Sequence, residues 1–279
     1  MKEIIITEST ITRYQSYLVR EEKSPATIEK YTRDVRAFSL FLSGRAVSKE
    51  LTVSYKRKLT EEGYAVRSIN SMLVSITRLM VFLDRPDCIV KTIRTQRQTY
   101  SEEEKELTKE EYYRLLRAAK VSPRLCLLLQ TICGTGIRVS ELQYFNLEMV
   151  RRGEITISCK GKIRNILVPG GLKKKLLDYA KINGIQSGVI FRTRSGRPMN
   201  RSNIWKEMKK LCESARINPN KVFPHNLRKL FARTFYSIEK DIAKLADILG
   251  HSSIETTRIY IMTSSTEHRR KIECLGLVV

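Results

Sequence analysis

PHNLRKLFARTFYSIEKDIAKLADILGHSSIETTRIY, residues 224–260, is the stretch that decides the fold and the candidate site. His225 and Arg228 are three residues apart, so a helix beginning here places both side chains on one face. His251 follows 23 residues after Arg228, and Tyr260 follows nine residues after His251. Arginine and histidine can bind or move charge around a phosphate, and a tyrosine can act as a nucleophile. The stretch therefore predicts a site for phosphate chemistry.

The composition supports a polyanionic partner. The 279 residues include 52 Lys and Arg against 29 Asp and Glu, a formal net charge of +23. Such an excess favours a polyanionic partner, because each Lys or Arg at a phosphate releases a condensed counterion. A ribosomal-type protein or a protein of membrane surfaces would be compatible with the same charge, so the charge does not decide alone.

Other classes of protein are disfavoured. The sequence has no run of about 18 apolar residues, the length a membrane span needs, and its N-terminus is too short and too soon acidic for a secretory signal. We therefore expect a cytoplasmic protein without a membrane partner. The six cysteines form no CxxC pair, and none of the three histidines neighbours a cysteine. The sequence predicts no disulfide framework and no metal site.

Periodicity and turn signals predict three regions: 1–85, 86–107 and 108–279. In the first, Ser24 is a candidate N-cap and Pro25 a first helical residue of a helix that ends at Gly44. Further helices are expected over 11–22, 47–62 and 68–83. Residues 86–107 lose the periodicity and are dense in charge, which is typical of a linker.

The third region begins with a capping pattern at Thr108 and Glu111. An apolar helix over 125–133 ends at GTG, and RVSELQYFNLEMV (138–150) is expected to form the beginning of the next helix. The alternation from 154 to 170, broken at Gly161, predicts a β-hairpin. Helical segments near 171–183 and 200–216 precede the helix of His225. The expected fold class is mainly α with a small antiparallel β-sheet.

Cleavage of a DNA phosphodiester by a tyrosine needs charge stabilisation, because a phenol with a pKa near 10 is a weak nucleophile at neutral pH. Arg138 and Arg228 are the candidates, since the planar guanidinium contacts two phosphate oxygens at once. His225 and His251 can donate to the phosphate or exchange a proton. A lysine on the hairpin can protonate the leaving 5′ oxygen.

That lysine is Lys160, although Lys162 stands beside it and either could be the catalytic one. Each candidate has a plainer interpretation when taken alone. Arg138 could cap a helix start with Glu141, His225 could be a structural histidine, and the residues around Gly250 could form an ordinary helix C-terminus. Tyr260 could be a core tyrosine, and Lys160 could simply contact a phosphate. The joint occurrence of the candidates, in order, favours the site.

Three segments together resemble the boxes of the tyrosine recombinase (phage integrase) family: GTGIRVSEL (134–142), HNLR (225–228) and LGHSSIETTRIY (249–260). The resemblance covers nearly the whole chain. It implies an N-terminal, SAM-like helical core-binding domain over 1–85, a linker over 86–107, and a catalytic domain over 108–279 that includes a C-terminal tail. It also implies a catalytic set in which Tyr260 is the nucleophile, the other members being Arg138, Lys160, His225, Arg228 and His251.

The family's chemistry sets further expectations. The resemblance implies double-stranded DNA as the partner, a 3′-phosphotyrosyl intermediate, a Holliday junction, no metal or other cofactor, and a homo-tetramer on two DNA sites. The short N-terminal region resembles Xer-like or small mobile-element recombinases without an arm-binding domain. Accessory or partner recombinases, the DNA sequence and the biological role stay open. The apolar end of the tail (Leu275, Leu277 and Val278) could dock on a neighbouring protomer or on its own domain.

Two alternatives to a recombinase remain at this point. A type IB topoisomerase uses a similar set of residues, but it acts as a monomer and relaxes supercoils. A catalytically silent DNA-binding protein is the other alternative. Covalent complex formation by Tyr260 separates the enzymes from the silent protein, and a demand for two DNA sites separates a recombinase from a topoisomerase.

Overall fold

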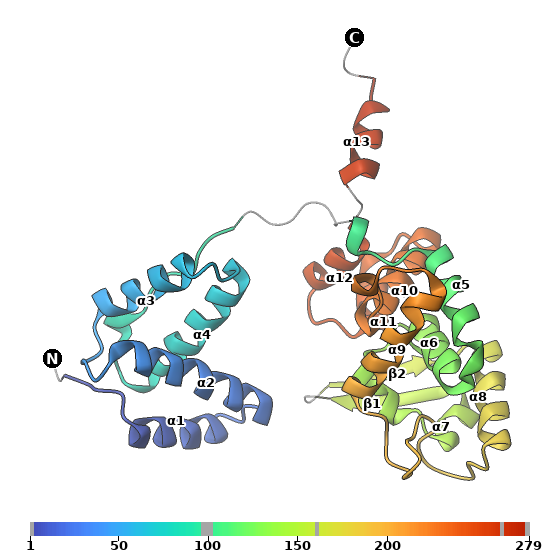
Figure 1. The fold of residues 1–279 in the computed structure, drawn as a ribbon, viewed down its shortest axis with the longest axis horizontal. Helices are drawn as coiled ribbons and strands as arrows, with labels where there is room; N and C mark the ends of the chain where they lie inside the picture. The colour runs from blue at the N-terminus through green and yellow to red at the C-terminus, as the bar shows by residue number, and fades with distance from the viewer. Residues whose placement is uncertain (1–2, 96–102, 160–161, 263–264, 277–279) are drawn as a thin grey trace. The chain divides into compact units, whose positions relative to one another are not determined.

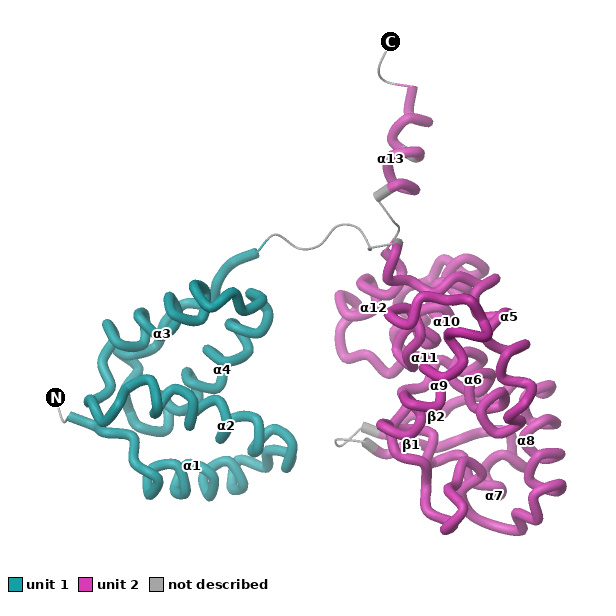
Figure 2. Tube along the Cα trace, viewed as in Figure 1, with its two compact units in different colours: residues 1–97 teal, residues 98–279 magenta. Residues whose placement is uncertain are grey.

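A computed structural model describes residues 3–95, 103–159, 162–262 and 265–276. Contacts divide the chain into two compact units, residues 1–97 and 98–279 (Figure 2). The described part is mainly helical and contains one small antiparallel sheet, so the expected fold class is confirmed (Figure 1).

The first unit is a helical bundle. Its elements are α1 (Glu8–Arg20), α2 (Pro25–Leu42), α3 (Lys49–Glu61), α4 (Val66–Phe82) and a 3₁₀ turn, η1 (Pro86–Cys88). The apolar residues spaced three and four apart along each helix face inward. They form a core in which Tyr14, Phe38 and Leu73 are fully buried.

The helix starts follow local capping chemistry. α2 begins at Pro25 with Ser24 as its N-cap residue, as predicted, but the Ser24 hydroxyl bonds the hydroxyl of Thr27 (2.8 Å) instead of a backbone N–H. α1 begins three residues earlier than expected. The Thr7 hydroxyl accepts a hydrogen bond from the backbone N–H of Thr10 (3.3 Å), which satisfies an N–H of the first turn.

The second unit carries the remaining elements. In chain order they are η2 (Glu103–Lys105), α5 (Lys109–Ala118), η3 (Ala119–Val121), α6 (Pro123–Thr135), η4 (Val139–Tyr144), α7 (Leu147–Arg152), β1 (Glu154–Cys159), β2 (Lys162–Leu167), α8 (Gly170–Ile182), α9 (Arg201–Ala215), η5 (Pro219–Lys221), α10 (Pro224–Ile238), α11 (Ile242–Leu249), α12 (Ile254–Ile261) and α13 (Ser265–Glu273). α10 packs against α6 and α12, and α11 packs against α12 (Figure 1). These contacts bring residues 134–142 and 224–260 together.

Three local expectations can be compared with the second unit. The capping pattern of α5 is confirmed: the Thr108 hydroxyl and the Glu111 carboxylate each accept from the other's backbone N–H (3.1 and 2.8 Å). The hairpin is also confirmed, with Ile157 paired to Arg164. The single helix expected within 138–150 is wrong. Two elements form there, because the Asn146 side chain accepts from the Met149 N–H (2.9 Å) and starts a new helix.

The two ends of the expected linker 86–107 pack on different units. Cys88 and Val90 are buried in the core of the first unit, and Leu107 is buried in the core of the second. The Arg233 side chain on α10 donates to the Glu106 carboxylate and to the Leu107 carbonyl. Glu106 and Leu107 are thus held against α10, the helix that carries His225 and Arg228.

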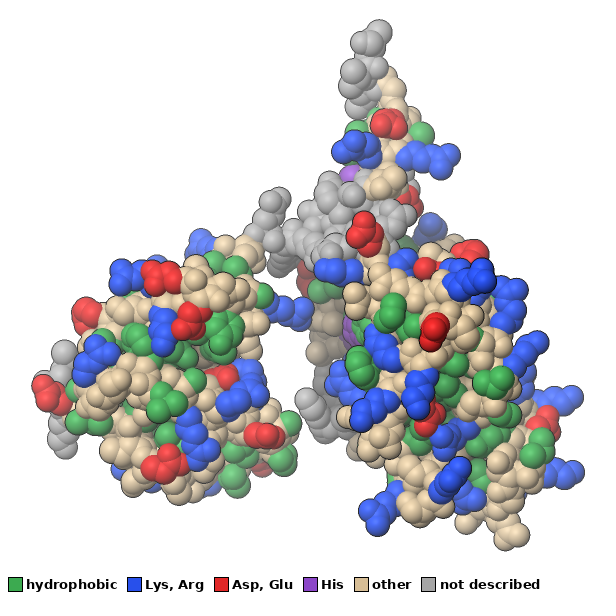
Figure 3. All heavy atoms as spheres, viewed as in Figure 1, with side chains coloured by type: hydrophobic (Ala, Val, Ile, Leu, Met, Phe, Trp, Pro, Cys, Tyr) green, Lys and Arg blue, Asp and Glu red, His purple; other side chains and the backbone are tan. Residues whose placement is uncertain are grey.

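The surface agrees with the charge of the sequence. Lys and Arg side chains are spread over the visible face of the second unit (Figure 3). No helix of the described residues is long and apolar enough to cross a membrane. In the same described ranges, no cluster of three His, Cys, Asp or Glu side chains has a geometry that could hold a metal ion.

Candidate active site

The N-terminus of α10 supplies the first two side chains of the site. Pro224 occupies the first helical turn, where its missing N–H costs nothing. His225 and Arg228 therefore lie one turn apart, as the sequence predicts. His225 keeps an exposed edge, whereas Arg228 is only 1% exposed. A buried arginine is expensive unless its N–H groups find acceptors.

Arg228 finds those acceptors on three different elements. Its Nη1 donates to the carbonyl of Gly136, at the end of α6 (2.5 Å). Its Nη2 donates to the carbonyl of Leu249, at the end of α11 (2.6 Å), and to Nε2 of His251 (3.0 Å). One guanidinium thus ties together the segments around Gly136 and His251.

Arg138 lies in the segment that leaves α6. The Glu141 carboxylate accepts from the backbone N–H of Arg138 (2.6 Å) and from its Nη1 (3.1 Å). Nη2 of Arg138 donates to the carbonyl of Gly250 (3.3 Å). Arg138 does make the capping contact with Glu141 that the sequence allowed. The same contact orients its guanidinium toward the turn that contains Gly250 and His251. Arg138 therefore makes the capping contact with Glu141 and also lies beside the other residues of the site.

The contacts of His251 fix its tautomer. Arg228 can only donate, so Nε2 of His251 must accept. A neutral His251 then carries its proton on Nδ1, which donates to the hydroxyl of Thr257 (2.9 Å). Thr257 is fully buried on α12. Sequence reasoning missed Thr257, although its position three residues before Tyr260 places both on one helical face.

Tyr260 packs between the two histidines. Its ring centroid lies 4.9 Å from that of His225 and 4.9 Å from that of His251. Its hydroxyl lies 3.5 Å from Nδ1 of His225, and the Arg228 guanidinium lies 5.8 Å from its ring centroid. The residue is 7% exposed. Although the side chain of Tyr260 is packed among its neighbours, its hydroxyl group faces the imidazole of His225.

Positive charge dominates the electrostatics. Burial, together with Lys229, Arg228 and other nearby cations, lowers the pKa of His225 to about 4. Burial, together with Arg228 and Arg138, lowers the pKa of His251 to about 4. Burial also lowers the pKa of Arg228, to about 10. At neutral pH both imidazoles are therefore neutral and the arginine is charged, so His225 can accept a proton from a neighbouring hydroxyl.

A surface hollow opens beside these groups, which we call the arginine–histidine hollow. It is lined by Ile137, Arg138, Val139, Ser140, Arg201, Trp205, Phe223, Pro224, His225 and Arg228. These lining residues include three arginines and no carboxylate, so the hollow suits an anion. Sequence reasoning missed Arg201 and Trp205, one turn apart at the start of α9. A cation and an aromatic four residues apart were the available signal.

Five of the six predicted site residues thus lie together in the second unit: Arg138, His225, Arg228, His251 and Tyr260. The sixth, Lys160, lies outside the described residues. Its rival Lys162 begins β2, of which the structure gives the backbone pairing.

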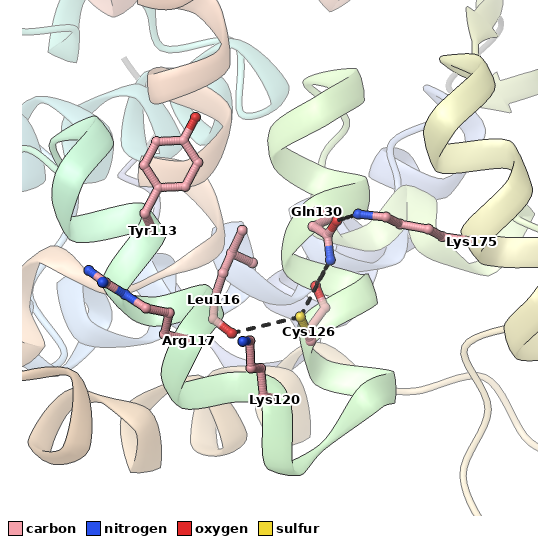
Figure 4. Close-up of a pocket in the computed structure, with 7 residues that line it drawn as sticks. All are labelled: Tyr113, Leu116, Arg117, Lys120, Cys126, Gln130 and Lys175. Atoms are coloured by element: carbon pink, nitrogen blue, oxygen red, sulfur yellow. Dashed lines mark hydrogen bonds between the residues drawn. The ribbon is translucent and has the colours of Figure 1, made fainter.

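A second hollow lies elsewhere on the unit, between α5, α6 and α8 (Figure 4). Nζ of Lys175 donates to the side-chain oxygen of Gln130 (2.6 Å), and Nε2 of Gln130 donates to the sulfur of Cys126 (3.4 Å). Arg117 and Lys120 complete a basic rim. The two hollows share no lining residue, so this one is separate from the arginine–histidine hollow.

The fold and the site define a class of protein: a mainly helical, basic protein whose buried tyrosine packs between two histidines and beside a buried arginine. Comparisons with known proteins agree with that class. The model of the phage integrase family matches residues 105–267, and the model of the phage integrase N-terminal SAM-like domain matches residues 11–86. The chain belongs to the phage integrase family, and it is a tyrosine site-specific recombinase.

Similar proteins cover the chain almost end to end. Tyrosine recombinase XerA of Pyrococcus furiosus is 28% identical over 100% of this chain and 98% of that protein. XerA of Thermococcus kodakarensis is 30% identical over 94% of this chain and 93% of that protein. XerD of Staphylococcus haemolyticus is 26% identical over 94% of this chain and 97% of that protein. The resemblance to Xer recombinases is confirmed.

Solved structures share the fold. A lambda integrase dimer bound to a COC′ core site is similar with a TM-score of 0.73 and 17% identity, over 91% of this chain and 95% of that one. The XerA recombinase crystal structure has a TM-score of 0.54 and 24% identity, over 95% and 97%. The Xer relatives are recombinases, and the alternatives of a topoisomerase and of a silent DNA-binding protein find no support.

Proposed function

We propose that Tyr260 is the nucleophile with which this recombinase cuts and rejoins DNA. Its oxygen attacks the scissile phosphorus, an O–P bond to tyrosine forms, and the bond from phosphorus to the 5′ oxygen breaks. The products are a 3′-phosphotyrosyl link and a 5′-hydroxyl. The observation that carries the proposal is the contact of 3.5 Å between the Tyr260 hydroxyl and Nδ1 of a neutral His225. That nitrogen can take the phenol proton as the bond forms.

The other residues stabilise charge. Arg138 and Arg228, which both line the hollow, neutralise the phosphoryl oxygens through their positive charge. Nε of Arg228 is buried and, among the described residues, has no hydrogen-bond acceptor. A buried N–H without an acceptor is costly, and a phosphate oxygen would supply one. His251 shares the Arg228 contact and orients that guanidinium. Lys160 protonates the leaving 5′ oxygen.

Rejoining reverses these steps. The 5′-hydroxyl of another strand attacks the phosphotyrosyl phosphorus and releases Tyr260, so the bond energy is conserved and no nucleotide is consumed. Two rounds of exchange through a Holliday junction recombine two duplexes. We propose a tetramer that holds both DNA sites, with residues 1–85 and 108–279 as the core-binding and catalytic domains. A lambda integrase tetramer bound to a Holliday junction, 18% identical to this chain, shares the fold.

Strand exchange between two labelled duplexes tests this function. DNA sites are first selected by binding from a random duplex library, and two sites carrying different labels are then incubated with the protein. Wild type is expected to produce exchanged strands and a four-subunit complex. Tyr260→Phe, which removes one oxygen, is expected to bind equally and exchange nothing. Relaxation of supercoils by single subunits, without exchange, would contradict the tetrameric recombinase.

A further inference from the structure

Three guanidinium groups surround the C-terminal end of α11. Each donates to a different carbonyl there, and the donor–acceptor pairs are Arg164 with Ile248 (2.6 Å), Arg228 with Leu249 (2.6 Å) and Arg138 with Gly250 (3.3 Å). Helix-end carbonyls lack intrahelical partners and carry partial negative charge, so they attract cations. Two of these arginines belong to the proposed catalytic set. The third has no role in it so far.

Arg164 lies deeper than Arg138. Its side chain is 14% exposed, against 44% for Arg138. Nη2 of Arg164 donates to Oε2 of Glu141 (2.5 Å), whose side chain is 5% exposed. The same carboxylate receives the backbone N–H and Nη1 of Arg138. One buried glutamate therefore stands between two arginines, and only the outer one lines the arginine–histidine hollow.

The turn before His251 is shaped around Arg164. Gly250 has φ of +63°, a conformation that favours glycine. A Cβ built on Gly250 would lie 2.6 Å from Cδ of Arg164, so the stem of that side chain occupies the space a larger residue would need. The charge of Arg164 also contributes, after burial and the two other arginines, to the lowered pKa of His251.

We propose that Arg164 is a positioning residue for the recombinase reaction. It holds Glu141, and through it the guanidinium of Arg138; it also holds the Ile248 carbonyl, and through it the turn that presents His251. The planar fork of Arg164 gives each partner its own Nη in a fixed geometry, whereas a lysine would have to reach both partners from a single nitrogen. This inference deepens the proposed function and rests on it.

Covalent adduct formation on a nicked duplex measures the role of Arg164. Arg164→Ala and Arg164→Lys are expected to slow adduct formation about 100-fold, the effect of misplacing catalytic groups by about 1 Å. DNA affinity should stay near that of wild type, because Arg164 faces protein groups. The matched control is Arg152→Ala, which removes the same charge from an exposed position at the end of α7. The control should react like wild type.

A double-mutant cycle separates positioning from general damage to the fold. If Arg164 acts in part through Arg138, the variant lacking both should lose less than the product of the two single losses, whereas independent losses would multiply. A scissile methylphosphonate gives a second readout, because it lacks the negative charge that Arg138 neutralises. The defect of Arg164→Ala should shrink at least tenfold on that substrate.

The outcomes are distinct. Multiplying losses in the cycle, or an undiminished defect on the methylphosphonate, would overturn the inference. If Arg164→Ala does not fold, as Trp205 fluorescence would show, Arg164→Lys decides through the same two readouts. A wild-type protein that forms no adduct would overturn the proposed function itself. A wild-type adduct with unchanged Arg164 variants would overturn only the positioning role.

Discussion

Gly136 offers a sharp test of the packing that holds the site. It ends α6 with φ of +65°, and a Cβ there would lie 2.4 Å from the ring of Phe231 on α10. Gly136→Ala therefore forces an alanine into a left-handed conformation, which costs about 1–2 kcal/mol. It also overpacks the contact with Phe231, which costs about 1–3 kcal/mol. We expect the free energy of unfolding to fall by about 2–5 kcal/mol. Because the Gly136 carbonyl accepts from Arg228, the loss should also disturb the site.

Gly184→Ala is the matched control for this substitution. Gly184 lies in the same unit after α8, with φ of +62° and nothing within 4 Å of its built Cβ. Only the conformational cost, about 1–2 kcal/mol, should appear there. Guanidinium unfolding followed by fluorescence of Trp205, the single tryptophan of the chain, reports on this unit alone. Equal destabilisation by the two substitutions would refute the close contact between Gly136 and Phe231.

Three further predictions concern the site itself. Arg138→Ala should slow cleavage about 10²–10³-fold while most DNA affinity remains. Equal losses of cleavage rate and DNA affinity would contradict a role of Arg138 in stabilising the transition state. The lowered pKa values of His225 and His251, about 4, mean that the unfolded chain binds more protons between pH 4 and the ordinary value of 6.5. Their stabilising contribution is thus fully present above pH 6.5 and lost as the pH falls toward 4, and replacing both by Gln should flatten that part of the stability curve. Thr257→Val should cost about 1–3 kcal/mol by leaving Nδ1–H of His251 without an acceptor, whereas Thr257→Ser should stay near wild type in thermal unfolding.

Much of the local structure could be predicted because it depends on neighbouring residues. The start of α2 at Pro25 and the reciprocal cap of Thr108 and Glu111 are confirmed, since both follow from chemistry within one turn. The β-hairpin could be predicted equally well from the alternation of apolar and polar residues over 154–170. The break at Asn146 was missed, because an asparagine inside an otherwise helical pattern can face solvent or start a new helix, and only its contact with Met149 decides between them.

The sequence predicted which residues form the site better than it predicted the contacts that those residues make. The motifs named five side chains that the fold brings together, yet the sequence does not say that Arg228 would be buried against two helix ends. Arg164 escaped attention because its acceptor Ile248 is 84 residues away. A signal did exist: alternation in β2 puts Arg164 on the same face as the buried Ile166. An arginine on the inner face of a hairpin calls for a buried partner.

The proposed role of Tyr260 as the nucleophile is tested by trapping the covalent adduct between the protein and DNA. The protein would be mixed with nicked duplexes that trap a cleaved strand, digested, and the DNA-bearing peptide sequenced by mass spectrometry. We expect a single adduct, in which the oxygen of Tyr260 carries the 3′-phosphate of the cut strand and the other fragment ends in a 5′-hydroxyl. An adduct on another residue, a linkage to the 5′-phosphate, or an undiminished adduct with Tyr260→Phe would contradict that expectation.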